Sequence, residues 1–208
     1  MMSDSAQRRL VRRTCVAAAL FFLALALLHR QVARADDQYD SAFARSVRAA
    51  TEHYRLALWG LNDGYVQTTD YVAGFGLMYT NHDRFDPADL AHPTMLVYNE
   101  AGQLVAVGYQ FAHAPYPSAF AAVPRSAWYS IPKHVHYNVA SGGAVHYGQA
   151  PWDSNDPPTA DALRAHKYMP ADGKLLFAFV HPAVRAIVVW AWLANPDGLF
   201  AGDNPAAP

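Results

Sequence analysis

Cysteine is nearly absent from this sequence, and its absence removes several kinds of chemistry. Cys15 is the one cysteine among 208 residues, and it lies close to the N-terminus. From residue 36 onward, the chain therefore offers no disulfide and no thiolate for nucleophilic attack or metal binding. The fold of that part must be stabilised by its hydrophobic core alone.

Basic residues are also scarce after residue 35, where ten lysines and arginines stand against sixteen aspartates and glutamates. The resulting net charge of about −6 argues against nucleic acid as a partner, and against an anionic membrane surface, because both need a basic face. Glutamates number only two, Glu52 and Glu100, so a glutamate pair for acid–base catalysis is not indicated. The sequence also contains no Gly-x-Ser-x-Gly elbow, no His-Glu-x-x-His motif and no phosphate-binding glycine loop.

No apolar run reaches the roughly 20 residues that a stable membrane-spanning helix needs. The longest, residues 14–28, has 15 residues, follows a segment with four arginines and precedes the small-x-small sequence Ala33-Arg34-Ala35. This order predicts a signal peptide over residues 1–35, and hence a periplasmic or secreted bacterial protein. The alternatives are an uncleaved membrane anchor formed by residues 14–28 and, from the pair Arg8-Arg9, twin-arginine export.

The remaining residues, 36–208, are predicted to form a single globular domain of the α+β class, mainly β. Apolar residues at helical spacing predict a long N-terminal helix from Asp40 to Leu58, and a short helix is expected from Thr159 to Lys167. Short apolar runs predict strands at residues 75–80, 95–98, 104–109, 134–139, 144–147, 175–180 and 186–192. Because the links are short, we expect a curved antiparallel sheet or a small barrel, packed by the first helix.

Nine histidines remain after residue 35, and four of them form a candidate metal site. His134 and His136 are two apart in a predicted strand, so both imidazoles should face one side of it. The turn Ser141-Gly142-Gly143 can bring His146 alongside, and His181 ends another apolar strand. Three histidines with an open position suit a zinc, iron, copper or manganese ion and are typical of a catalytic site, such as that of a cupin-like metal enzyme. The other interpretation is that these rings only hydrogen-bond to water or backbone.

Aromatic residues indicate an alternative function. Trp190 and Trp192 share one face of the last predicted strand, and Tyr137 follows the histidine pair. Such rings can line an apolar ligand pocket, although a sheet domain of this size also needs bulky side chains in its core. The alternative is therefore a non-catalytic envelope protein that binds a small apolar ligand or a protein partner. The sequence specifies neither the oligomeric state nor a reaction.

The C-terminal segment, Trp190-Ala-Trp192-Leu-Ala-Asn195-Pro196-Asp-Gly198-Leu-Phe200 followed by Asn204-Pro205, resembles the ending of a family of uncharacterised secreted bacterial proteins. Residues 74–81 and 95–109 are similar to the central part of the same family. The resemblance implies a single exported domain, and the family has no assigned activity. Its members place His or Glu at four positions where this chain has Met78, Thr94, Gly108 and Val188. The resemblance therefore implies that a metal site of those relatives has lost its ligands here, which leaves His134 and His136 as the candidate pair.

Overall fold

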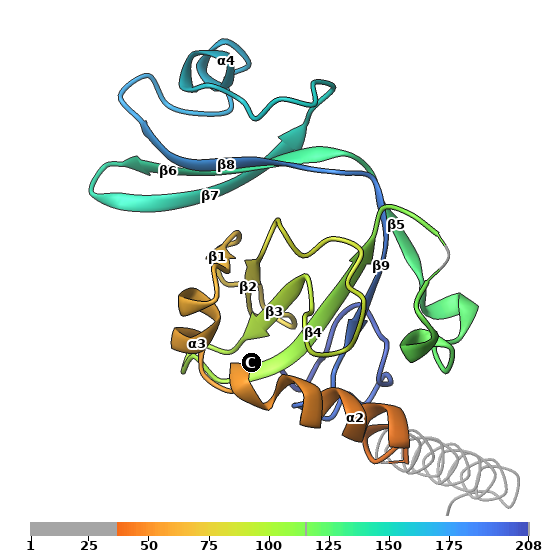
Figure 1. Ribbon diagram of the computed structural model, residues 1–208. Helices are drawn as coiled ribbons and strands as arrows, with labels where there is room; N and C mark the ends of the chain where they lie inside the picture. Colours follow the sequence, from red (N-terminus) through yellow and green to blue (C-terminus); the bar gives the residue numbers. More distant parts are fainter. Residues whose placement is uncertain (1–36, 115, 208) are drawn as a thin grey trace, which may run out of the picture.

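The computed structural model describes residues 37–114 and 116–207, and it consists mainly of β-structure (Figure 1). Nine strands form two antiparallel sheets in these residues, a six-stranded sheet in the order β1-β2-β3-β4-β9-β5 and a three-stranded sheet in the order β7-β6-β8. The prediction of a mainly β, antiparallel fold is confirmed. Both sheets are open within the described part of the chain, so the predicted alternative of a small barrel is not formed.

The predicted signal peptide, residues 1–35, lies outside the described residues, and so does its alternative as an anchor through residues 14–28. Within residues 37–114 and 116–207, no helix combines the length and the apolar character needed to cross a bilayer.

The element bounds differ from the predicted ones mostly at the ends. The helical segments are α2 (Ala42–Thr51), η1 (Glu52–Tyr54), α3 (Ala57–Asn62), η2 (Ser118–Phe120), η3 (Arg125–Ala127) and α4 (Ala160–Ala165). The strands are β1 (Val66–Gln67), β2 (Leu77–Thr80), β3 (Met95–Tyr98), β4 (Leu104–Phe111), β5 (Tyr129–Ile131), β6 (His134–Ser141), β7 (Ala144–Pro151), β8 (Lys174–His181) and β9 (Val184–Val189). The predicted short helix and the predicted β3–β4 hairpin are confirmed, whereas β1 and β5 were not predicted from the sequence.

The long N-terminal helix predicted from Asp40 to Leu58 is not formed as one helix. Its first part is α2, which begins after Ser41, whose hydroxyl accepts a hydrogen bond from the Ala44 backbone N–H at 3.2 Å. The chain then leaves the helix because Leu56 is extended and forms an antiparallel bridge with Gln103. Periodicity alone could not reveal that pairing, because it depends on a residue far along the chain.

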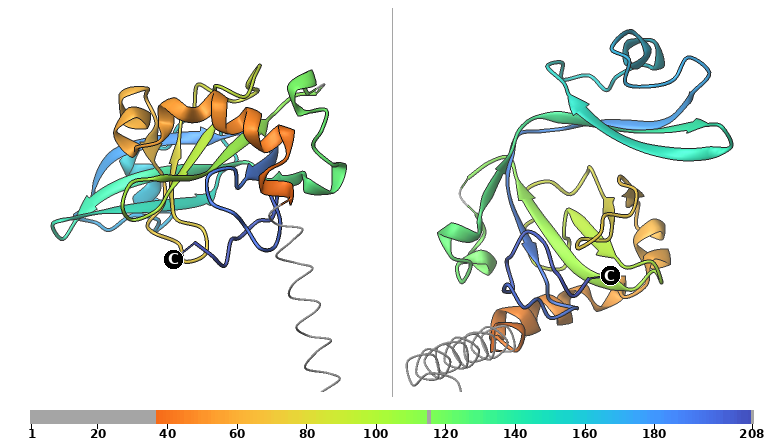
Figure 2. Two further views of the ribbon diagram at one scale, coloured as in Figure 1. Left: turned by 90° about the horizontal axis from the view of Figure 1, so that it is seen from below. Right: turned by 180° about the vertical axis from the view of Figure 1, so that it is seen from behind.

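Each sheet has one face covered by a helix (Figure 2). On the six-stranded sheet, α2 contributes to a core whose buried members include Ala44, Val47, Leu96, Tyr98 and Val107. On the three-stranded sheet, α4 contributes to a second core whose buried members include Leu163, Val135, Val139 and Met169. The other faces of the two sheets both contribute side chains to one cavity, and the candidate site lies there.

A continuous two-stranded ribbon connects the two sheets. β5 runs into β6 and β8 runs into β9, with Ile131 paired to Val184 on one side of the bend and His134 paired to His181 on the other. The ribbon changes sheet at Pro132 and Pro182, which have no backbone N–H to give to a ladder. The bend therefore places His134 and His181 at the corner where the sheets meet.

Candidate metal centre

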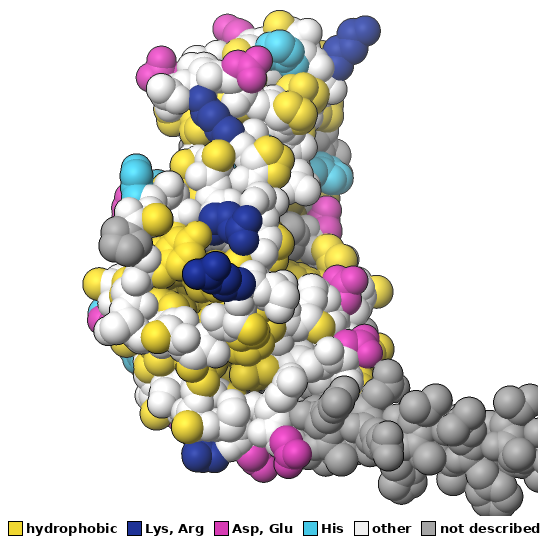
Figure 3. Space-filling model, turned by 90° about the vertical axis from the view of Figure 1, so that its right-hand side faces the viewer, with side chains coloured by type: hydrophobic (Ala, Val, Ile, Leu, Met, Phe, Trp, Pro, Cys, Tyr) yellow, Lys and Arg dark blue, Asp and Glu magenta, His cyan; other side chains and the backbone are white. Residues whose placement is uncertain are grey.

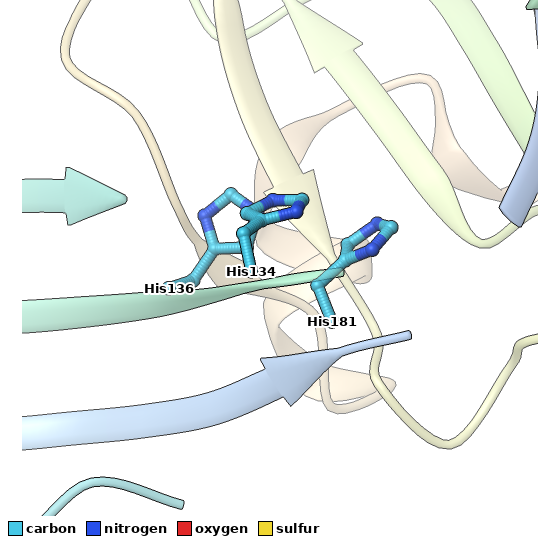
Figure 4. Close-up of side chains that lie close together, drawn as sticks. All are labelled: His134, His136 and His181. Atoms are coloured by element: carbon cyan, nitrogen blue, oxygen red, sulfur yellow. The ribbon is translucent and has the colours of Figure 1, made fainter. Parts of the chain in front are cut away.

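Three of the four predicted histidines, His134, His136 and His181, come together at this corner (Figure 4). His134 and His136 project from the same face of β6, and the β6–β8 register sets His181 directly opposite His134. One nitrogen atom from each of the three rings can be chosen so that all three atoms lie within 4.8 Å of one another. The Nε2 atoms of His134 and His136 are 3.0 Å apart. This spacing is compatible with metal–nitrogen bonds of about 2.0–2.1 Å to one shared ion.

Backbone carbonyls at the bend fix the orientation of two of the rings. His134 Nδ1 donates to the Pro132 carbonyl oxygen at 2.8 Å, and His181 Nδ1 donates to the Pro182 carbonyl oxygen at 2.7 Å. Each bond sets the tautomer, because the donating nitrogen carries the proton and leaves Nε2 with a lone pair. A carbonyl on the outer nitrogen is the usual support of a metal-binding histidine.

Burial keeps the two inner rings neutral. His136 is 3% exposed and His181 2% exposed, whereas His134 is half-buried. Burial lowers the pKa of His136 to about 3, with further lowering by His134 and His181. Burial also lowers the pKa of His181 to about 4, again with a contribution from His134. Neutral imidazoles are the form that binds metal, so the site is ready for an ion without first losing protons.

The hydrogen bonds among the rings leave one buried nitrogen unsatisfied. His134 Nε2 is unprotonated once Nδ1 donates to Pro132, so the proton in the 3.0 Å contact must come from His136 Nε2. His136 Nδ1 is then an acceptor, and it is buried without a hydrogen bond of good geometry to a described residue, although the Thr68 backbone lies close enough to raise the pKa of His136. An unsatisfied buried polar atom costs about 1–3 kcal/mol.

Gln110 of β4 joins the cluster from the six-stranded sheet, and no pattern in the sequence predicts this contact. Its Oε1 lies 3.1 Å from His181 Nε2, and the side chain is 4% exposed. Because His181 Nδ1 already donates to Pro182, the neutral ring has no second proton for Oε1. Either the amide NH₂ of Gln110 turns toward Nε2, or Oε1 and Nε2 share a cation. In both arrangements Nε2 carries an available lone pair.

Aromatic rings and thioethers enclose the three histidines. Phe179 stacks on His136 with ring centroids 5.1 Å apart, and Phe85 approaches His181 edge-on at 5.0 Å. The three imidazole rings border a cavity of about 120 Å³, which is room for an ion and a few waters. Its other lining residues include Met78, Met95, Gln110, Tyr129 and Gln149, with no aspartate or glutamate among the described lining residues.

An outer hollow adjoins this cavity. It is lined by residues 131–134 and 149–151, and both His134 and Gln149 also line the inner cavity. His134 is thus the ring that stands between the two spaces, consistent with its partial exposure. His134 is therefore partly open to solvent, whereas His136 and His181 remain buried.

His146, the fourth predicted ligand, is not part of the group. The predicted β6–β7 hairpin forms, but its register pairs His146 with Val139 and pairs His136 with Gln149. Directly paired residues share a face of the sheet, and Val139 belongs to the core on the opposite face from the histidines. His146 is exposed, and its Nε2 lies 3.3 Å from the Ser141 carbonyl oxygen.

The aromatic pocket expected from Trp190, Trp192 and Tyr137 is not formed either, because these rings belong to three separate clusters. Trp190 is fully buried and donates to the Ala201 carbonyl oxygen at 2.8 Å. Trp192 packs against the core below α2, and its Nε1 donates to Thr51 Oγ1 at 3.0 Å. Tyr137 lies in the core beneath α4. Each of these three aromatic residues thus packs in a different hydrophobic cluster.

Comparison of the chain with protein-family models, curated proteins and solved structures gave no match. The function is therefore argued from the geometry of the site.

Proposed function

We propose that the protein is exported and binds one transition-metal ion through His134, His136 and His181. The observation that carries this proposal is the convergence of three ring nitrogens within 4.8 Å of one another at the bend of the ribbon. Export is supported by the order of basic, apolar and small-x-small segments in residues 1–35.

A bound ion would resolve the hydrogen-bond conflict among the three rings. With an ion on the three Nε2 atoms, His136 would move its proton to Nδ1, so that no ring would have to donate to another. His181 would keep its Nδ1 bond to Pro182, and Gln110 Oε1 would lie beside the ion as a fourth donor atom, an oxygen next to three nitrogens.

The ligand set favours copper or zinc. Imidazole nitrogens without carboxylates suit copper, zinc, nickel and iron, whereas magnesium and calcium require oxygen ligands. Copper binds most tightly among the divalent ions of the first row, and the thioethers of Met78 and Met95 line the same cavity. We therefore expect the order copper above zinc above the earlier metals.

Elemental analysis of the purified protein, prepared without a histidine tag, tests this proposal. We expect about one equivalent of copper or zinc per chain after loading and dialysis. A His134→Ala/His136→Ala variant should lose the ion, and His146→Ala, which removes an exposed histidine outside the cluster, should retain it.

Failure to load copper, zinc, nickel or iron, in a protein whose circular dichroism shows it to be folded, would contradict the proposal. Equal metal content in the double variant and in His146→Ala would also contradict it, since binding would then occur elsewhere.

A further inference from the structure

A second site lies on another face of the molecule, where the chain between β4 and β5 folds over the end of the six-stranded sheet. Side chains from η2, η3 and β9 enclose a hollow of about 610 Å³, within the range of pockets that hold small organic ligands. Figure 3 shows this side of the protein, with apolar side chains gathered around a hollow and basic groups standing over it. None of the three histidines of the candidate metal centre lines this hollow.

Aromatic rings form a rigid wall of the hollow. Tyr116 and Trp128 stack with centroids 4.5 Å apart and planes 15° from parallel. Phe120 packs behind them, 6.3 Å from Trp128 and 4.8 Å from Tyr109 of the main core. Tyr116 remains 37% exposed, so the stacked pair presents apolar ring surface to the hollow instead of burying it.

Two guanidinium groups, those of Arg125 and Arg185, also line the hollow, which has no aspartate or glutamate among its described lining residues. Arg185 is held in place because its Nη1 donates to Ser130 Oγ at 3.2 Å and its Nη2 to the Trp128 carbonyl oxygen at 3.1 Å. A guanidinium has five N–H donors, so Arg185 keeps several for a ligand.

Four of the seven arginines among the described residues are paired with an acidic side chain. Arg48, Arg55, Arg84 and Arg164 each form an ion pair with an aspartate or glutamate. Among the described residues, no such ion pair involves Arg125 or Arg185. Two positive charges, of which that of Arg185 is held by hydrogen bonds, lie beside an apolar ring wall and are complementary to a molecule with an anionic head and a flat apolar body.

We propose that this hollow, here called the arginine pocket and made by Tyr116, Phe120, Arg125, Trp128 and Arg185, binds a small aromatic carboxylate. The carboxylate accepts hydrogen bonds from the two guanidinium groups, and the ring packs on the Tyr116–Trp128 pair. This site is independent of the metal centre, so the two proposals can fail separately.

Titration with naphthalene-2-carboxylate, followed by tryptophan fluorescence and by calorimetry, tests the proposal. Naphthalene-2-carboxamide is the matched neutral ligand, because it has the same ring and no charge. We expect the carboxylate to bind at least about tenfold more tightly than the amide, a difference of about 1.4 kcal/mol. Raising the salt concentration should reduce this preference, because both arginines are solvent-exposed.

An Arg125→Gln/Arg185→Gln variant should bind both ligands alike, and Tyr116→Ala should weaken both. Lys174→Gln, which removes an exposed positive charge at the start of β8, is the control and should behave as the wild type. Equal binding of carboxylate and amide to the wild type would overturn the proposal. So would a double arginine variant with an unchanged carboxylate preference, or no binding of either ligand up to about 1 mM.

Discussion

His136 is 3% exposed and His181 is 2% exposed, so a proton on either ring would place a charge inside the protein. The pKa of His136 is lowered to about 3 and that of His181 to about 4, whereas an unfolded histidine has a pKa of about 6.5. Below about pH 6.5, these two histidines therefore bind protons in the unfolded chain and stay neutral in the folded chain. The contribution of these two neutral histidines to stability is fully present above pH 6.5, and it is lost as the pH falls toward the folded-state pKa values of about 4 and about 3.

The metal-free protein should accordingly lose stability on acidification. Below about pH 6, each of the two histidines should lower the free energy of unfolding by about 1.4 kcal/mol per pH unit. Urea unfolding between pH 7.5 and pH 4.5 measures this slope. In a His136→Asn variant, the slope should be smaller by about 1.4 kcal/mol per pH unit, the contribution of one histidine, because asparagine does not titrate.

The control for this prediction is His146→Asn, which changes an exposed ring and should keep the slope of the wild type. If His136→Asn and His146→Asn had the same slope, His136 would not be the buried neutral group that the structure indicates. Chemical-shift titration of the ring protons would show the same result without any substitution.

At the scale of elements, the β6–β7 hairpin decides which histidines meet. Ser141 pairs with Ala144 across the two-residue turn Gly142-Gly143, in which both glycines have positive φ, 58° and 82°. Two consecutive residues with positive φ are typical of a type I′ turn, and two glycines adopt it without steric cost. A two-residue turn at this place already implies that His136 faces Gln149 and that His146 faces Val139. The sequence thus contained the signal that excludes His146.

A second feature holds this register. Gly148 lies directly opposite Tyr137, and a Cβ on Gly148 would run into the Tyr137 ring. The ring therefore lies over the glycine, as in other sheets where an aromatic side chain covers a glycine of the neighbouring strand. A shift of the register by one residue would destroy this contact and turn every side chain of β7 to the other face.

Gly148→Ala should therefore destabilise the protein by about 1–3 kcal/mol, the usual cost of overpacking a well-filled site. Urea unfolding at pH 7.5 gives this value. Gly202→Ala is the matched control, because nothing lies within 4 Å of its Cβ position, and it should change stability by no more than about 0.5 kcal/mol. Equal effects of the two substitutions would mean that the Tyr137–Gly148 pair does not determine the register.

Other elements could not be read from local patterns. The helical periodicity of residues 40–58 is real, yet Leu56 leaves the helix to bridge Gln103. β5 is short and largely exposed, and it exists because Tyr129 and Ile131 pair with Ala186 and Val184 of β9. In both cases a partner distant in sequence decides the conformation, and such pairing overrides local propensity.

At the scale of the whole molecule, the candidate site belongs to both sheets. The three histidines come from the ribbon, whereas Gln110 and Phe85 reach them from β4 and from the loop before β3. His-x-His spacing predicted the first two ligands, and the position of His181 at the end of an apolar strand indicated the third. The contribution of Gln110 follows only from the way the sheets face each other, which depends on the bend at Pro132 and Pro182.

Because the ribbon is continuous, an ion bound at its bend should stabilise the fold as one unit. A ligand that binds only the folded state adds about 4 kcal/mol at a free concentration of about 1,000 times its Kd. For a domain of this size, about 1 kcal/mol corresponds to about 2–4 °C in Tm. Saturating zinc should therefore raise Tm by about 8–16 °C in a single transition, measured by circular dichroism and by tryptophan fluorescence.

The same increase should appear in His146→Ala and be absent in His134→Ala/His136→Ala, whose remaining imidazole cannot hold the ion alone. A transition that splits in two on adding zinc would mean that the sheets unfold separately, with the ion stabilising only the three-stranded sheet that carries its ligands. Coincident shifts from circular dichroism and from tryptophan fluorescence would instead show that the bend transmits the binding energy to the whole domain. Both signals follow both sheets, since Trp190 packs on the six-stranded sheet and Trp152 on the three-stranded sheet.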